Sequence, residues 1–222
     1  MFSIFTPEVI SMLVEGIRDT LYMTIFSTVI AYAFGLPLGI CLKVTSKDGL
    51  KPNKIVYGFL DVLCNIVRSI PFLILLILLI PFTRFVVGKS YGSTATIVPL
   101  VVCAAPYIAR MVESSLNEVD SGIIEAAKSM GASNWDIVVH VMLVEARTSL
   151  IVGATITTGN ILGYSAMSGT VGGGGLGDIA VRYGYYRWQT SIMIVTVILL
   201  IILFQIIQNI GMSIANKMDK RK

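Results

Sequence analysis

Five apolar stretches alternate with short polar segments along this chain of 222 residues. Each stretch is close to the roughly 20 residues that an α-helix needs to cross the hydrocarbon core of a bilayer. The polar segments leave no room for a separate soluble domain. The pattern therefore predicts an all-α membrane protein with five transmembrane helices. The predicted spans are Thr20–Leu42, Ile55–Phe82, Ala95–Val112, Val144–Met167 and Ser191–Ala215.

A further amphipathic segment, residues 1–19, precedes the first span. Thr6 is a typical helix cap, Pro7 suits the first helical position, and Glu8 lies near the positive end of the helix dipole. We expect an interfacial helix that anchors the chain at the outer face of the membrane. Residues 20–222 are predicted to form a single transmembrane domain.

Composition and charge agree with a membrane protein and predict its orientation. Hydrophobic residues make up 55% of the chain and charged residues only 14%, and the mean hydropathy is +0.81. Lysine and arginine gather on the cytoplasmic side of membrane proteins. The N-terminus is therefore predicted outside and the C-terminus in the cytoplasm. The deciding residues are Lys43, Lys47, Lys51 and Lys54 after the first span, and Lys217, Lys220, Arg221 and Lys222 at the C-terminus.

The most informative polar segment is residues 114–147, which this orientation places in the cytoplasm. Gly131 suits the left-handed position that closes one short helix, and Ser133 can cap the next helix. Asp136, three residues after Ser133, completes a variant of the capping box. The small side chains of Ala126 and Ala127 would let this helical hairpin enter a groove of a partner protein. An ordinary capped hairpin at the membrane surface is the alternative.

This segment resembles the cytoplasmic loop of the permease subunits of ATP-binding-cassette (ABC) importers. That loop reads E-A-A-x3-G-x9-I-x-L-P, and Glu125, Ala126, Ala127, Gly131 and Leu143 match it. Val141 stands for the isoleucine, while Val144 replaces the proline and leaves the second helix free to continue. The resemblance implies a type I importer permease fold. It also implies a coupling helix whose contacts with a separate ATPase subunit include Glu125, Ala126, Ala127, Gly131 and Ala132.

Further segments are similar to the methionine-type permeases within this superfamily. The resemblance implies a homodimer in the bacterial cell membrane, two ATP-binding subunits and an external methionine-binding lipoprotein, with D- or L-methionine moved by alternating access. A permease for another amino acid or small polar solute is the alternative. The similar segments are Arg68–Phe72, Pro81–Arg84, Ala105–Glu113, Gly163–Met167, the glycine run Gly172–Gly177, and Tyr183–Tyr185.

Polar residues inside the spans indicate where a solute could pass, because they are costly in lipid and usually face a cavity or a partner. In the fourth span, Thr157, Asn160, Tyr164 and Met167 recur at helical spacing and are predicted to line the path. Tyr164 and Met167 could form a soft wall or a gate. Helix packing is the alternative there, since Gly159-x-x-x-Gly163 is a small-xxx-small motif.

Two other spans carry polar residues or prolines. Arg68 is a further candidate path residue, and Asp61 could offset its positive charge through Asn65. Pro71, shortly after Arg68, predicts a bend in the helix. Snorkelling of Arg68 to the membrane surface is the alternative. In the third span, Pro99 and Pro106 predict a broken helix beside a cavity.

Other functional classes find little support. The run Gly172–Gly177 satisfies G-x-G-x-x-G, but no strand precedes it, so it does not indicate a dinucleotide site. It could instead offer a flexible surface to the binding protein, or be only a turn. His140, the single histidine, has no partners spaced for a metal. We predict no cofactor, metal, nucleic acid or catalytic site, and rank a secondary transporter or a membrane enzyme below an ABC permease.

Overall fold

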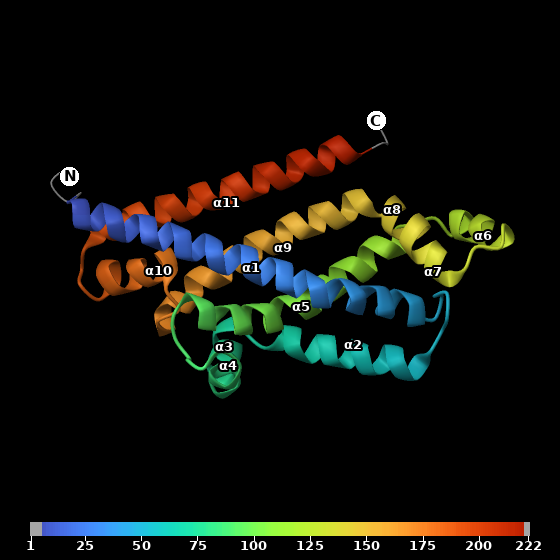
Figure 1. Ribbon diagram of the computed structural model, residues 1–222, viewed down its shortest axis with the longest axis horizontal. Helices are drawn as coiled ribbons and strands as arrows, with labels where there is room; N and C mark the ends of the chain where they lie inside the picture. Colours follow the sequence, from blue (N-terminus) through green and yellow to red (C-terminus); the bar gives the residue numbers. More distant parts are fainter. Residues whose placement is uncertain (1–5, 220–222) are drawn as a thin grey trace. The chain divides into compact units, whose positions relative to one another are not determined.

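The computed structural model describes residues 6–219, and every regular element in that part of the chain is helical. Short connecting helical turns cover Ile137–Met142 and Ala180–Tyr185, both π-helical, and Gly169–Val171. The α-helices, labelled in Figure 1, are α1 Pro7–Thr45, α2 Lys54–Ser69, α3 Phe72–Leu78, α4 Ile80–Val87, α5 Ser93–Asn117, α6 Ser121–Ser129, α7 Asn134–Asp136, α8 Leu143–Glu145, α9 Arg147–Ser168, α10 Gly175–Ile179 and α11 Thr190–Met218.

Four helical segments among the described residues are long and apolar enough to cross a membrane. They are α1, α5, the run Arg147–Tyr185 that contains α9 and α10, and α11. A fifth span is obtained when α2 and α3 are counted together across the break between them. The predicted all-α membrane architecture is confirmed, and the side of the membrane on which each end lies stays a prediction.

The N-terminal segment is continuous with the first span, because α1 runs for 39 residues from Pro7 to Thr45. The predicted cap is present: the Val9 N–H donates to Thr6 Oγ1 at 3.4 Å. The first residues of the proposed interfacial helix, 1–5, lie outside the described part of the chain. That this part of α1 lies on a membrane surface stays a prediction.

Prolines have opposite effects in two of the predicted spans. At Pro71 the chain breaks as expected, since α2 ends at Ser69 and α3 begins at Phe72. The predicted break in the third span is wrong, because Pro99 and Pro106 lie inside the continuous 25-residue helix α5. Both prolines are buried. A helix enclosed by its neighbours tolerates the loss of single backbone hydrogen bonds, so proline alone did not decide where this span bends.

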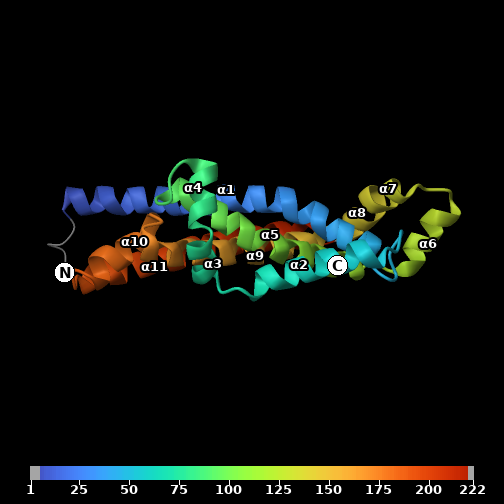
Figure 2. The same cartoon turned by 90° about the horizontal axis from the view of Figure 1, so that it is seen from below.

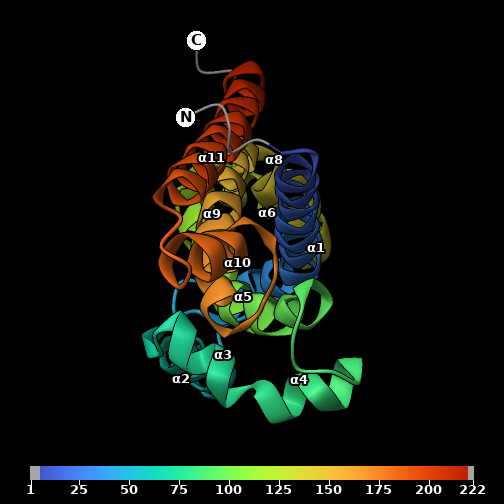
Figure 3. The ribbon, with the colours of Figure 1, turned by 90° about the vertical axis from the view of Figure 1, so that its left-hand side faces the viewer.

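The helices group into two compact units, of which the first contains residues up to Ile30, Ile70–Cys103 and Thr158–Gln208. Here α10 packs on the first half of α1, as Figure 3 shows, through a cluster that includes Leu13, Leu176 and Ile179. The Leu176 N–H also donates to Thr20 Oγ1 at 2.9 Å. A Cβ on Gly175 would lie 2.7 Å from that oxygen. This end of the glycine run is therefore packed against α1 rather than exposed as a flexible surface.

The second unit contains Ala31–Ser69, Ala104–Thr157 and the residues from Asn209 onward. Its core is a close contact between α1 and α5. A Cβ on Gly35 would lie 2.7 Å from the Ala105 carbonyl oxygen, and one on Gly39 only 2.5 Å from that of Ala109. Two small-xxx-small motifs thus face each other and bring the backbones together. Helix α2 lies along the same part of α1 (Figure 2), where Cys64 packs against Leu42.

Candidate functional site

The polar segment predicted to bind a partner forms a helical hairpin made of α6, α7 and the turn between them (Figure 1). Gly131 has a φ of +83°, in the left-handed region, as predicted. The Gly131 N–H donates to the Lys128 carbonyl at 2.9 Å and the Ala132 N–H to the Ala127 carbonyl at 3.1 Å. This pair of bonds is the Schellman motif, which closes α6 and sets the direction in which the chain leaves it.

The second half of the hairpin begins at the predicted cap. Ser133 Oγ accepts from the Asp136 N–H at 3.2 Å and donates to the Asp136 carboxylate at 2.5 Å. That donated bond lowers the pKa of the Asp136 carboxyl. His140 Nδ1 lies 3.6 Å from the same carboxylate, so the histidine has one acidic neighbour. No group of three or more metal-ligating side chains occurs among the described residues.

The surface of the hairpin is more apolar than a solvated turn requires. Glu125 and Ala126 are exposed, and Met130 and Trp135 are 82% and 72% exposed. Ala127 is only 5% exposed and packs inward, so it is not on the outer face as the sequence suggested. Large apolar side chains held outward on a rigid turn are typical of a binding surface for another protein.

Beyond α7 the helix continues toward the next span, as the replacement of proline by Val144 predicted. The π-helical turn Ile137–Met142 leads into α8, and a single turn residue, Ala146, separates α8 from α9. A cavity of about 410 Å³ lies beside this junction and the end of α11. Its wall includes Glu118, Glu145 and Arg147. The hairpin is thus connected directly, by helix, to one of the candidate spans.

The predicted path residues of α9 do not share one face. Thr157 is 1% exposed and donates to the Gly153 carbonyl of its own helix at 2.8 Å, which favours the packing alternative for this residue. Asn160 is exposed and Met167 is 46% exposed, so these two lie together on an open face. Tyr164 is partly buried and stacks on Phe72, with ring centroids 4.8 Å apart.

The two glycines of the small-xxx-small motif in α9 also have different surroundings. A Cβ on Gly159 would meet the Phe204 ring at 2.8 Å, so this glycine permits close packing of α9 on α11. At Gly163 a Cβ would meet nothing within 4 Å. Gly163 is exposed, one turn from Asn160 and from Met167. The open face of α9 therefore runs through Asn160, Gly163 and Met167.

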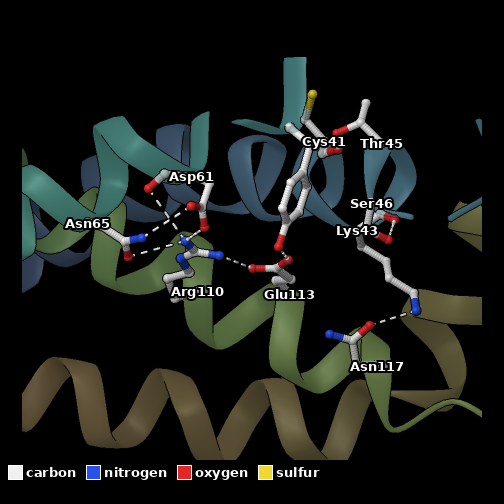
Figure 4. Close-up of polar contacts among 10 residues, drawn as sticks. Cys41, Lys43, Thr45, Ser46, Asp61, Asn65, Arg110, Glu113 and Asn117 are labelled. Atoms are coloured by element: carbon white, nitrogen blue, oxygen red, sulfur yellow. Dashed lines mark hydrogen bonds and ion pairs between the residues drawn. The ribbon is translucent and has the colours of Figure 1, made fainter. Parts of the chain in front are cut away.

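Arg68 is exposed and has different surroundings from those predicted. Its guanidinium carbon lies 5.9 Å from the centroid of the Tyr107 ring, a cation–π arrangement. Asp61 and Asn65, which the sequence suggested as its partners, instead bind Arg110 of α5 (Figure 4). Because this pairing joins α2 to α5, helical spacing within α2 could not reveal it.

The Arg110 network was missed at the level of sequence. Arg110 forms a charge-assisted bond with Asp61, donates to Asn65 Oδ1 at 3.2 Å, and donates to Glu113 at 2.7 Å (Figure 4). Tyr57 donates to the other oxygen of Glu113 at 3.1 Å. One signal was available: Arg110 and Glu113 are three residues apart and therefore adjacent on one helix. The network fixes α2 against α5.

These features define a class: a multi-pass helical membrane protein with a capped helical hairpin, bearing exposed apolar side chains, between two of its spans. The chain belongs to the family of inner membrane components of binding-protein-dependent transport systems, whose model matches residues 35–211. It is thus a multi-pass protein of the bacterial inner membrane and a transport subunit, as expected from the sequence.

Curated relatives and solved structures resemble nearly the whole chain. It is 46% identical over 210 residues to the probable D-methionine transport system permease protein MetI of Vibrio cholerae, covering 95% of this chain and 93% of that one. It is 43% identical over 222 residues to the methionine import system permease protein MetP of Bacillus subtilis, and the match covers both chains completely.

The fold matches a solved transporter equally well. An inward-facing structure of the MetNI methionine ABC transporter contains a chain that is 44% identical, with a TM-score of 0.96, covering 97% of this chain and 100% of that one. A chain from an amino acid ABC transporter superimposes with a TM-score of 0.78 at 18% identity and covers 95% of each chain, which shows a shared fold alone. The predicted permease fold is confirmed.

Proposed function

We propose that this chain is the membrane-spanning subunit of an ATP-driven importer and that the imported solute is methionine. The family to which it belongs supports transport. The chain matches the methionine permeases of Vibrio cholerae and Bacillus subtilis over at least 93% of their length, which supports methionine as the solute. The fold shared with a methionine ABC transporter supports ATP as the energy source.

The observation that carries the proposal is the capped hairpin with its outward apolar side chains. Met130 and Trp135 would bind in a groove of an ATP-binding subunit, with Glu125 available to pair with a basic residue at its edge. The Schellman turn at Gly131, followed by Ala132, holds the two helices at a fixed angle. A movement of the ATPase would then pass through the helical connection to α9.

The proposed assembly contains two copies of this chain, two ATP-binding subunits and an external methionine-binding lipoprotein. Helix α11 is suited to contact lipid or another subunit, since only 11% of its most apolar stretch of 18 residues is buried within the chain. In this assembly the solute would move past the open face of α9. Asn160 and Met167 would line the path, with Tyr164 beside them. Arg68 is a further candidate path residue.

Uptake of labelled methionine by vesicles tests the proposal. The vesicles contain this chain, its ATPase and its binding protein, and ATP is supplied to the ATPase side. Glu125→Arg places a charge of the wrong sign in the docking groove and is expected to lower uptake at least about tenfold, because like charges at an interface cost several kcal/mol. Asp48→Arg is the matched control, since Asp48 is also exposed but lies in the turn after α1. Its uptake is expected to be unchanged.

The possible results test the ATP-driven mechanism and the identity of the solute separately. ATP-dependent uptake of methionine that is lost only in Glu125→Arg would support both parts of the proposal. ATP-dependent uptake of a different amino acid would retain the importer and correct the solute. Uptake that needs no ATP and survives Glu125→Arg would overturn the importer and favour a secondary transporter.

A further inference from the structure

A short aromatic turn just before α11 is unused by the proposed transport function. Tyr185, Tyr186 and Trp188 are 64%, 67% and 86% exposed, whereas most aromatic rings of this size are largely buried in a folded chain. The Tyr185 and Tyr186 rings pack edge to face with centroids 5.3 Å apart. We call these three residues the aromatic turn.

The aromatic turn is held rigidly against the start of α11. A Cβ on Gly184 would lie 2.8 Å from Met193 Cβ, so the backbone sits directly on the first turn of that helix. The Gln189 N–H donates to the Tyr183 carbonyl at 3.2 Å and closes the turn. The Arg187 guanidinium carbon lies 4.5 Å from the Tyr183 ring centroid. The exposed rings are thus presented by a fixed backbone rather than by a loose loop.

Trp188 has an unusual backbone conformation. Its φ of +58° is the only positive value among the described residues other than glycine. A bulky side chain rarely adopts this left-handed conformation, and such strain persists where the surroundings impose it. In this conformation the largest ring of the turn is 86% exposed. An outward ring that is strained into place indicates a surface with a binding role.

The length of α11 indicates what this surface meets. Its 29 residues rise about 44 Å, which exceeds the roughly 30 Å hydrocarbon core of a bilayer. Its most apolar stretch of 18 residues has a mean hydropathy of 2.8. Its first residues, Thr190 and Ser191, are polar and are preceded by Gln189. The polar residues at the start of α11 therefore suit the level of the lipid headgroups, and the aromatic turn directly precedes them.

We propose that the aromatic turn binds the interfacial region of the phospholipid bilayer and fixes the depth at which α11 enters it. Tryptophan and tyrosine favour this region because their rings are apolar and their N–H and O–H groups remain hydrated. Arg187, on the same turn, adds a positive charge suited to lipid phosphate. The proposal depends on the membrane location of the chain and is independent of the solute and the ATPase.

Tryptophan fluorescence tests the proposal, because the chain contains only Trp135 and Trp188. Trp135→Phe leaves Trp188 as the single reporter, and Trp188→Phe is the matched variant that leaves Trp135 on the hairpin. Each full-length chain is placed in lipid nanodiscs, which are open to water on both faces. Fluorescence is then quenched with phosphatidylcholine brominated near the headgroup end or near the methyl end of its acyl chains, and separately with aqueous iodide.

Trp188 is expected to lose most fluorescence with bromine near the headgroup end, less with bromine near the methyl end, and little with iodide. Trp135 is expected to be quenched by iodide and unaffected by either lipid. The unsubstituted chain should show both populations, which covers the case of a variant that folds poorly. Free quenching of Trp188 by iodide, with no effect of either lipid, would overturn the proposal. Shielding of Trp188 only after a binding protein is added would also overturn it, in favour of a protein-docking surface.

Discussion

Arg110 donates from Nη1 to a carboxylate oxygen of Glu113 at 2.7 Å, one turn further along α5. The two side chains are 18% and 9% exposed, so the pair lies largely out of water. Asp61 of α2 shares the same guanidinium. A buried carboxylate that loses its paired cation remains charged, and nothing then offsets the hydration free energy that it lost on burial. Arg110 is therefore the residue on which this network depends.

Arg110→Met is expected to lower the free energy of unfolding by about 3 kcal/mol, because it leaves the buried carboxylate of Glu113 without a countercharge. Thermal unfolding of the purified chain in detergent measures the change. Lys43→Met is the matched control, since it removes a bond to Asn117 that is exposed to solvent. Its midpoint should move little. Adding Glu113→Gln to Arg110→Met should recover part of the loss, and equal midpoints for all variants would contradict the role given to Arg110.

Because α1 packs closely on α5, adding a methyl group at Gly39 should affect stability differently from adding one at Gly58. Gly39→Ala would place a Cβ 2.5 Å from a backbone oxygen of α5, and is expected to cost about 1–3 kcal/mol of stability. Gly58→Ala in α2 meets nothing within 4 Å and is expected to stabilise by up to about 1 kcal/mol. Unfolding midpoints of the two variants compare them directly. A Gly39→Ala chain as stable as the parent would show that the helices are farther apart than described.

The hairpin should be sensitive to backbone conformation at Gly131. At φ +83° an asparagine is tolerated but a β-branched residue is not, and a Cβ there meets no neighbour. Gly131→Val is therefore expected to distort the turn at a local cost of about 1–2 kcal/mol, whereas Gly131→Asn should retain it. ATP-dependent uptake should fall in Gly131→Val and persist in Gly131→Asn, with similar insertion of both chains. Equal uptake by both would mean that the turn geometry is not used in coupling.

The Ser133–Asp136 cap predicts a specific dependence on pH. The pKa of Asp136 is lower in the folded hairpin than in the unfolded chain, chiefly because Ser133 Oγ donates to it. Its stabilising contribution is therefore present above the unfolded pKa and is lost as the pH falls through the folded value. Ser133→Ala should raise the Asp136 pKa toward its ordinary value, which carboxyl-carbon NMR titration measures. A titration of Asp136 that is identical in both chains would contradict this origin of the shift.

Much of the fold could be predicted because it depends on local chemistry. Continuous apolar stretches of about 20 residues form helices in a bilayer, since a helix satisfies the backbone hydrogen bonds within the segment itself. Gly131 and Ser133 end and begin their helices through bonds to residues within four positions, so these features could be predicted from neighbouring residues alone. Thr6 and Pro71 are equally local.

The residues that were misplaced depend on contacts between distant segments. Whether Pro106 breaks its helix, whether Thr157 faces inward, and whether Asp61 pairs with Arg68 or with Arg110 are each decided by which helix packs alongside. The sequence by itself determined which stretches are helical, the break at Pro71 and the capped hairpin around Gly131 and Ser133, because propensity and capping act within a few residues. Only the tertiary structure decided the open face of α9, the Arg110 network and the contact of Gly39 with α5, because burial and charge pairing join residues far apart in the chain.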